Sequence, residues 1–153
     1  MLLRSRYVLP LAAVLAAAGC GGGGHGKAAS TAPVPSTPAA ERAAVADVWQ
    51  RFFDGSTQAS AKVALLQNGA AFAQTIEAQA KSPLAKQSSA KVSKVVLVSA
   101  TRATVFYAID LSGKPALPHQ RGVAIKDGGR WQVAQTSFCA LLKLEGAPPA
   151  ACS

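Results

Sequence analysis

The apolar residues of this chain change their spacing once, and that change decides the fold class. From residue 38 to about residue 81 they recur every three or four positions, which is the period of a helix that buries one face. From residue 95 to about residue 133 they alternate or run continuously, as they do in strands. This order predicts an α+β domain, in which N-terminal helices pack on one side of a four-stranded antiparallel sheet.

The helical half divides into three segments. The first begins at Pro38 with Thr37 as its N-cap and ends before the pair Asp54-Gly55. The second, "SAKVALLQNG", ends at Asn68, a residue type that readily adopts a left-handed cap, and the third spans residues 70–81. The spacing predicts that the buried face of the first helix holds Val45, Val48, Trp49 and Phe52.

The second half has the patterns of strands. The run "VVLV" at residues 95–98 predicts a strand that is covered on both faces. In "ATVFYAIDL" the residues alternate, so that Tyr107 and Asp110, three positions apart, face opposite sides. We interpret "GKPALP" as a loop, and "RGVAIKDGGRWQVAQTS" as a hairpin that turns at Asp127-Gly128-Gly129. The segment "SFCALLKL" predicts a short helical turn.

The N-terminal segment has the pattern of a secretory signal. Two arginines precede an apolar run at residues 7–18, which is shorter than the roughly 20 residues that a membrane-spanning helix needs. The following "LAAAGC" resembles a bacterial lipobox, whose cysteine receives a diacylglyceryl group and becomes the mature N-terminus. We therefore predict a signal peptide at residues 1–19 and lipidation of Cys20. The alternative is ordinary cleavage after Ala18, which would give an unlipidated secreted protein.

Residues 20–37 are predicted to be a tether between that anchor and a single folded domain at residues 38–153. The segment is rich in Gly, Ser, Thr and Pro and has too few apolar residues to build a core. We expect the domain to lie outside the cytoplasm, anchored to the outer face of the cell membrane, with shedding or secretion as an alternative. His25 lies alone in this segment and is not expected to bind a metal.

The three cysteines agree with this location. If Cys20 is acylated, Cys139 and Cys152 remain as an even pair, which we expect to form a disulfide in an oxidising compartment. The alternative is two free thiols.

The charge and the motifs exclude several classes of function. The net charge is +9, but the basic residues are scattered and few aromatic residues lie among them, so we do not expect nucleic acid binding. We predict no metal site and no cofactor, since His119 lacks a second ligand at metal spacing. The motif Ser88-Ser89-Ala90-Lys91 has the S-x-x-K spacing of penicillin-binding enzymes, but their other motifs are missing and we interpret it as a polar loop.

Four segments carry a resemblance to a known family. These segments, "VWQRFFDGST", "KVALLQNG", "ATVFYAIDLSGKP" and "GGRWQVAQTSFCALLKLEGAPPAAC", resemble in this order the mycobacterial-type low-molecular-weight-antigen-like lipoproteins. The domain of that family is similar to the cystatin-like, nuclear-transport-factor-like fold, in which a curved sheet wraps around helices. The resemblance implies this fold and an extracytoplasmic location, and it brings no catalytic residues.

We predict a small non-catalytic binding domain for an apolar ligand or an envelope protein partner, held in the concavity of the sheet. The candidate lining residues are Trp49, Phe52, Phe72, Phe106 and Tyr107, although aromatic residues at these spacings are more often plain core. The alternative is a cone-fold enzyme of the ketosteroid isomerase or dehydratase type, with Tyr107 as hydrogen-bond donor and Asp110 as base. Since these two residues face opposite sides of one strand, we favour the binding module.

Overall fold

The structure, a computed structural model, describes residues 36–146 and 148–153. The predicted signal peptide, the predicted lipidation site Cys20 and His25 lie outside the described residues. Inspection of the helices within the described range finds none that is long and apolar enough to cross a bilayer.

The first helix, α1 (Pro38–Phe53), begins and ends as its sequence predicts. The Oγ1 atom of Thr37 accepts a hydrogen bond from the backbone N–H of Ala40 at 3.2 Å, which satisfies one of the free donors of the first turn. Asp54 is the C-cap. The predicted face is buried, and its members are Val45, Val48, Trp49 and Phe52.

Two short α-helices follow, α2 (Ala59–Leu65) and α3 (Ala73–Ala80). Asn68 adopts the predicted left-handed conformation between them, with φ of 54°. The third predicted helix differs at its start, because its first turn is a 3-10 helix, η1 (Gly69–Phe72), and only the remainder is α-helical. A further 3-10 turn, η2 (Ala85–Gln87), leads into the sheet.

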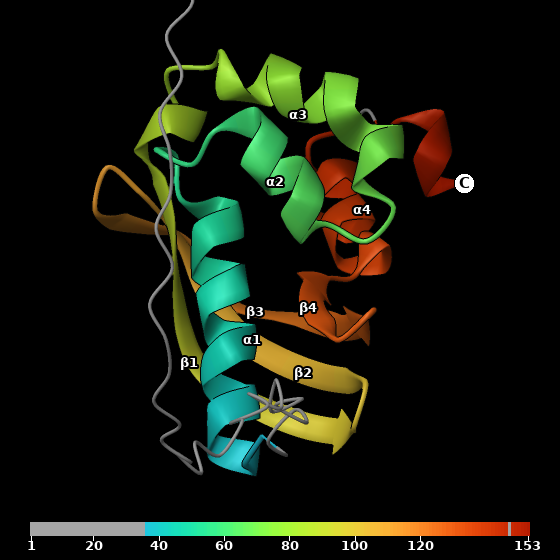
Figure 1. The fold of residues 1–153 in the computed structure, drawn as a ribbon. Helices are drawn as coiled ribbons and strands as arrows, with labels where there is room; N and C mark the ends of the chain where they lie inside the picture. The colour runs from blue at the N-terminus through green and yellow to red at the C-terminus, as the bar shows by residue number, and fades with distance from the viewer. Residues whose placement is uncertain (1–35, 147) are drawn as a thin grey trace, which may run out of the picture. The chain divides into compact units, whose positions relative to one another are not determined.

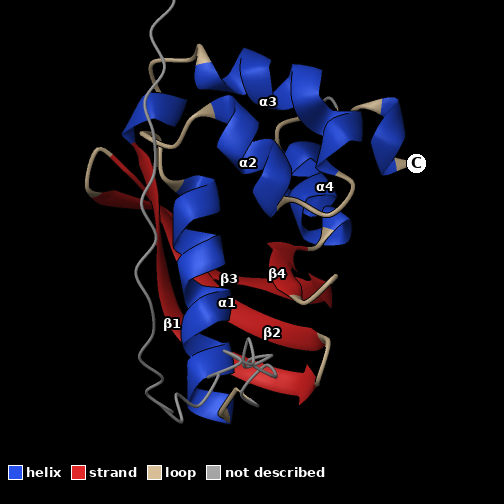
Figure 2. Cartoon of the chain, in the orientation of Figure 1, coloured by secondary structure: helices blue, strands red, loops and turns tan. Residues whose placement is uncertain are grey.

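Four antiparallel strands form one sheet in the order β1-β2-β3-β4. Their bounds are β1 (Ser88–Ser99), β2 (Arg102–Leu111), β3 (Lys114–Asp127) and β4 (Arg130–Val133). Figures 1 and 2 show α1 lying along one face of this sheet, with α2 and α3 at one end of α1. The predicted α+β class, with N-terminal helices on a curved four-stranded antiparallel sheet, is confirmed.

Two of the predicted strand features are wrong. The strand that contains "VVLV" begins at Ser88, and Val96 and Val98 are 38% and 59% exposed, so only one face of β1 is covered. The reason is that the helices pack on one face of the sheet: Val95 and Leu97 point to that face and the core, and nothing described covers the side on which Val96 and Val98 lie. The segment "GKPALP" is not a loop, because Lys114 to Pro118 already belong to β3.

The chain after β4 closes the domain. The predicted helical turn is a ten-residue helix, α4 (Gln135–Leu144), which buries Phe138, Cys139 and Leu142. The hydroxyl of Ser137 accepts a hydrogen bond from the N–H of Val123 at 2.7 Å, which ties α4 to β3 beyond the end of β4. A last 3-10 turn, η3 (Ala150–Cys152), follows.

The two edges of the sheet differ. At the β4 edge, Leu66 forms a parallel bridge with Val133, and the N–H of Gln67 donates to the carbonyl of Val133 at 2.9 Å. The side chain of Gln132 also donates to the carbonyl of Ala64 at 3.2 Å. The segment after α2 therefore covers the edge of β4, whereas β1 forms the other edge of the sheet and has a strand neighbour on one side.

Candidate functional site

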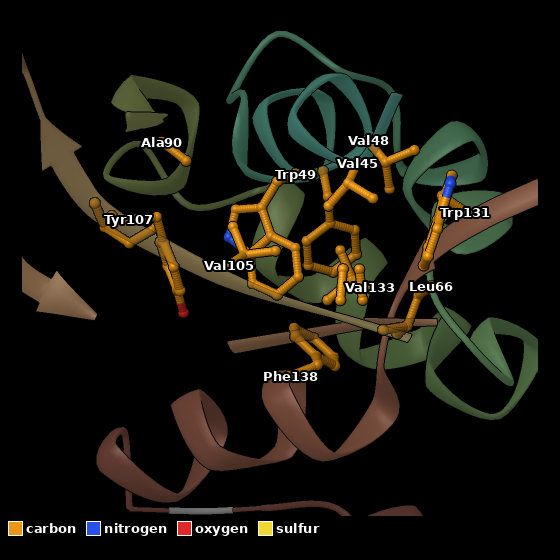
Figure 3. Close-up of a cluster of buried hydrophobic side chains, with 14 of the residues drawn as sticks. Val45, Val48, Trp49, Leu66, Ala90, Val105, Tyr107, Trp131, Val133 and Phe138 are labelled. Atoms are coloured by element: carbon orange, nitrogen blue, oxygen red, sulfur yellow. The ribbon is translucent and has the colours of Figure 1, made fainter. Parts of the chain in front are cut away.

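Four of the five aromatic residues predicted to line a pocket pack against one another and against α4. Trp49 and Phe72 are fully buried, and Phe52 and Tyr107 are 3% exposed. The rings of Trp49 and Tyr107 meet edge to face with centroids 5.1 Å apart. The ring of Phe138 in α4 packs edge to face against the rings of Phe52 and Phe72, with centroid distances of 5.4 Å and 5.5 Å. Figure 3 shows Trp49, Tyr107 and Phe138 converging on the same interior. This part of the predicted pocket is a packed core.

Gly122 shows how closely the core is packed beneath α1. A Cβ atom added at this position would lie 2.5 Å from two ring carbons of Trp49. Since real Cβ atoms essentially never approach so closely, the ring of Trp49 occupies the space that a side chain on β3 would need. The indole N–H of Trp49 has no hydrogen-bond partner among the described residues.

The fifth candidate, Phe106, lies on the other face of the sheet, so the structure does not bring it together with the other four. On β2 the core side is taken by Val105 and Tyr107, and the intervening Phe106 is half-buried on the side away from the helices. Its ring lies between two cations: the Nζ of Lys94 is 6.0 Å and the Cζ of Arg121 is 5.9 Å from the ring centroid. These distances are those of cation–π contacts.

A hollow of about 380 Å³ opens beside Phe106. Its size falls within the range of small-molecule sites. All three long strands contribute to its lining, which consists of Lys91, Ser93, Phe106, Tyr107, Ala108, Pro115, Pro118, His119 and Gln120. The wall is mainly apolar, and Lys91 and His119 add polar groups to it.

The hollow exists because β3 does not pair regularly with β2. Tyr107 pairs with Gln120 but Ile109 pairs with Leu117, so Pro118 and His119 of β3 lie opposite the single residue Ala108 of β2, and β3 has one extra residue in the ladder. Proline cannot donate a ladder hydrogen bond, and His119 has a positive φ of 57°, so the backbone bulges here. The sequence analysis missed Pro115, Pro118 and His119 as site residues. The signal was available, since two prolines near a predicted strand indicate an irregular edge or a bulge.

Asp110 and Tyr107 are not assembled into an isomerase-like pair. Tyr107 faces the core, where burial raises the pKa of its hydroxyl from 10.0 to about 12. Asp110 is 1% exposed, and its Oδ2 atom forms an ion pair of 2.6 Å with the Nζ of Lys91, which also lines the hollow. Its Oδ1 atom has no partner among the described residues.

The S-x-x-K segment is not a polar loop but the start of β1. The hydroxyl of Ser88 donates to backbone carbonyls, either that of Phe53 at 2.8 Å or that of Ala85 at 2.7 Å, while Lys91 pairs with Asp110 on the opposite face. The serine therefore has a structural partner, and no contact links it to the lysine. Residues 36–146 and 148–153 contain no group of three or more His, Cys, Asp or Glu side chains that could hold a metal ion.

Cys139 and Cys152 lie at disulfide distance. The Cα atoms are 5.4 Å apart, and the bond joins α4 to the last turn of the chain. Both residues are in or against the hydrophobic core.

Comparison with known protein families gives a match over most of the described domain. The sequence model of the family described as "Low molecular weight antigen MTB12, C-terminal domain" matches residues 37–149. The matched range begins at the N-cap of α1 and includes all four strands and α4. The search of curated proteins found no match.

Proposed function

The chain belongs to the family of the low molecular weight antigen MTB12 C-terminal domain, and we propose that it is an extracytoplasmic lipoprotein that presents a small non-catalytic binding domain. In this proposal, Cys20 carries the lipid anchor at the outer face of the cell membrane. Residues 20–37 tether the domain, which binds an apolar ligand or an envelope protein partner without a cofactor.

The location rests on three features of the sequence and one of the structure. The short apolar run, the lipobox-like "LAAAGC" and the polar segment after it are those of a processed lipoprotein. Outside the cytoplasm, a cysteine pair at bonding distance is expected to be oxidised, which agrees with the placement of Cys139 and Cys152.

The hollow beside Phe106 is the observation that supports binding. The concavity of the sheet, which the sequence analysis predicts to hold the ligand, is filled by the side chains of Trp49, Phe52 and Tyr107. The hollow combines an apolar wall with a few polar groups, which is the usual composition of a ligand site. The proposed site therefore lies on the opposite side of the sheet from the predicted one.

The positions of the candidate catalytic groups support the proposal of a non-catalytic role. An isomerase of the cone fold needs its base and its hydrogen-bond donor in one cavity. Here Asp110 is held by Lys91 and Tyr107 is packed against Trp49, on opposite faces of β2.

Native mass spectrometry of the protein purified from its own membrane tests this proposal. We expect a bound ligand or partner, seen as a defined added mass. Ala108→Phe should fill the hollow and abolish that mass, because Ala108 lines it. The matched control is Val96→Phe, which adds the same ring on β1 outside the hollow.

The outcomes are distinct. A bare wild-type protein would contradict the binding role. A bound mass that survives Ala108→Phe but is lost in Phe52→Leu would move the site back to the helix side of the sheet.

A further inference from the structure

The side of the sheet that faces away from the helices is both basic and apolar. We call it the outer face and define it by the cations Lys94, Arg102 and Arg121 and the apolar residues Val96, Val98 and Phe106. We propose that the outer face docks on an anionic lipid surface, so that the domain lies against the membrane. The proposal rests on the proposed function for the presence of that membrane.

The charges of the outer face favour an anionic partner. Lys94, Arg102 and Arg121 are exposed and form no ion pair with any described residue. The carboxylate of Asp110, near the end of β2, is 1% exposed and is already paired with Lys91. Cations of this kind, without an ion-pair partner, each strengthen binding to an anionic bilayer about fivefold.

The apolar residues of the outer face favour a bilayer over a purely polar anion. Val96 and Val98 belong to the few large hydrophobic residues that the described part of the chain exposes. Phe106 lies between Lys94 and Arg121, so apolar and cationic groups alternate across neighbouring strands. Membrane-surface proteins combine these two features, because apolar side chains enter the interface while cations meet the headgroups.

The place where the chain enters the domain agrees with this orientation. Glu41, in the first turn of α1, accepts a hydrogen bond of 2.7 Å from Lys126, and the backbone N–H of Lys126 donates to the carbonyl of Thr101. The start of α1 therefore lies at the end of the sheet where β1 turns into β2, which is also the end that holds Val98 and Arg102. The 16 residues from 21 to 36 could span at most about 55 Å, so a domain anchored at Cys20 stays near the bilayer.

The aliphatic character of the surface argues against a single-stranded nucleic acid as the occupant. Such ligands are held by several aromatic side chains on which successive bases stack. Of the residues that define the outer face, Phe106 is the one aromatic, and the other two apolar residues, Val96 and Val98, are aliphatic.

Co-sedimentation with vesicles tests the proposal. The mature chain from residue 20, with Cys20→Ser so that no acyl chain contributes, is mixed with phosphatidylcholine vesicles with or without phosphatidylglycerol. We expect binding that needs the anionic lipid and is lost at high salt. The variant Lys94→Gln/Arg102→Gln/Arg121→Gln should bind roughly 100-fold more weakly, at about fivefold for each cation removed.

The matched control removes three exposed cations elsewhere. Lys81, Lys86 and Lys143 lie at the end of α3, in η2 and in α4, and the variant with glutamine at all three has the same net charge. It should retain most of the wild-type affinity. An equal loss in both variants would show that net charge alone drives binding and would overturn the proposal.

An environment-sensitive fluorophore reports the orientation. Val98 and Leu84 are equally exposed, at 59% and 57%, but Leu84 lies next to η2, outside the sheet. A label on Val98→Cys should shift to shorter wavelength on anionic vesicles, and a label on Leu84→Cys should not. No shift at residue 98, or tighter binding to soluble polyglutamate than to vesicles, would overturn the proposal. Because the chain carries no lipid, neither result depends on whether Cys20 is acylated.

Discussion

Lys126 of β3 donates a hydrogen bond to Glu41 in the first turn of α1, at 2.7 Å and across 85 residues of sequence. The indole N–H of Trp131 donates to the second oxygen of the same carboxylate. One side chain thus joins the start of the helix to two strands, and its negative charge also suits a helix N-terminus.

This contact predicts a pH-dependent stability. The hydrogen bond from Lys126, followed by that from Trp131, holds the pKa of Glu41 below its ordinary value of 4.5. A carboxyl whose folded pKa is depressed stabilises the fold above the unfolded pKa and loses that contribution as pH falls through the folded pKa. Glu41→Gln should therefore lower the melting temperature near pH 7, and the difference from wild type should vanish once the pH has fallen through the lowered pKa of Glu41. Glu77→Gln, at an exposed site on α3, is the control. A difference that persists in acid would mean that the charge of Glu41 is not what stabilises the contact.

The cysteine pair predicts a measurable crosslink. We expect no titratable thiol at Cys139 or Cys152 when the mature protein is denatured without reductant. Cys152→Ser should lower the free energy of unfolding by about 3 kcal/mol, the value for a loop of roughly 14 residues in the chain-entropy model. Two titratable thiols in the acylated protein would refute the pairing and remove one argument for an extracytoplasmic location.

Gly122 predicts a strong steric effect. Gly122→Ala should destabilise the domain by about 1–3 kcal/mol, because the added methyl group would meet the ring of Trp49 at 2.5 Å. The substitution should cost clearly less in a Trp49→Phe background, where the smaller ring leaves room. Chemical denaturation of the two single variants and the double variant gives the coupling. If the effects of Gly122→Ala and Trp49→Phe on the free energy of unfolding are additive, the added methyl group does not clash with the ring of Trp49.

The burial of Phe52 predicts how far a truncation in the core lowers the free energy of unfolding. It is 3% exposed and packs edge to face against Phe138 at 5.4 Å. Phe52→Ala should reduce the free energy of unfolding by about 3–5 kcal/mol, a large part of the stability of a small domain. Leu84→Ala, at an exposed site, should change it by less than about 0.5 kcal/mol. A small loss at Phe52 would indicate that its ring lines an open cavity.

The lipid anchor predicts where the protein is found in cells. Cys20→Ala should move the protein from the membrane fraction to the medium, since two acyl chains are enough for stable anchoring and the variant has no thiol to acylate there. Intact-mass measurement of the wild type should show a mature N-terminus at Cys20 with added acyl mass. A wild-type protein that begins at Gly19 and is already soluble would contradict the anchor.

The helical half was predictable because its local signals and its packing agree. Thr37 and Pro38 mark the start of α1, Asn68 adopts its left-handed turn, and the spacing of Trp49 and Phe52 gives the buried face. These signals depend on neighbours within a few positions, so the sequence alone contains them.

The sheet was less predictable because its features depend on distant partners. The composition of "VVLV" cannot show that only one face of β1 is covered, which is decided by where the helices pack on the sheet. The face of the sheet on which Phe106 lies follows from the alternation of side chains along β2. The hollow beside it, however, arises from the irregular pairing of Pro118 and His119 with β2. A site built by a register shift between two strands has no signature in either strand taken alone.

The cover over β4 limits how this protein can polymerise. Because the segment at Leu66 and Gln67 covers the edge of β4, β1 is the one terminal strand of the described sheet with an open edge. Growth of a continuous intermolecular sheet requires two free edges on every subunit. Pairing of β1 with β1 would use up the open terminal strand of both molecules, so growth through the terminal strands stops at a dimer.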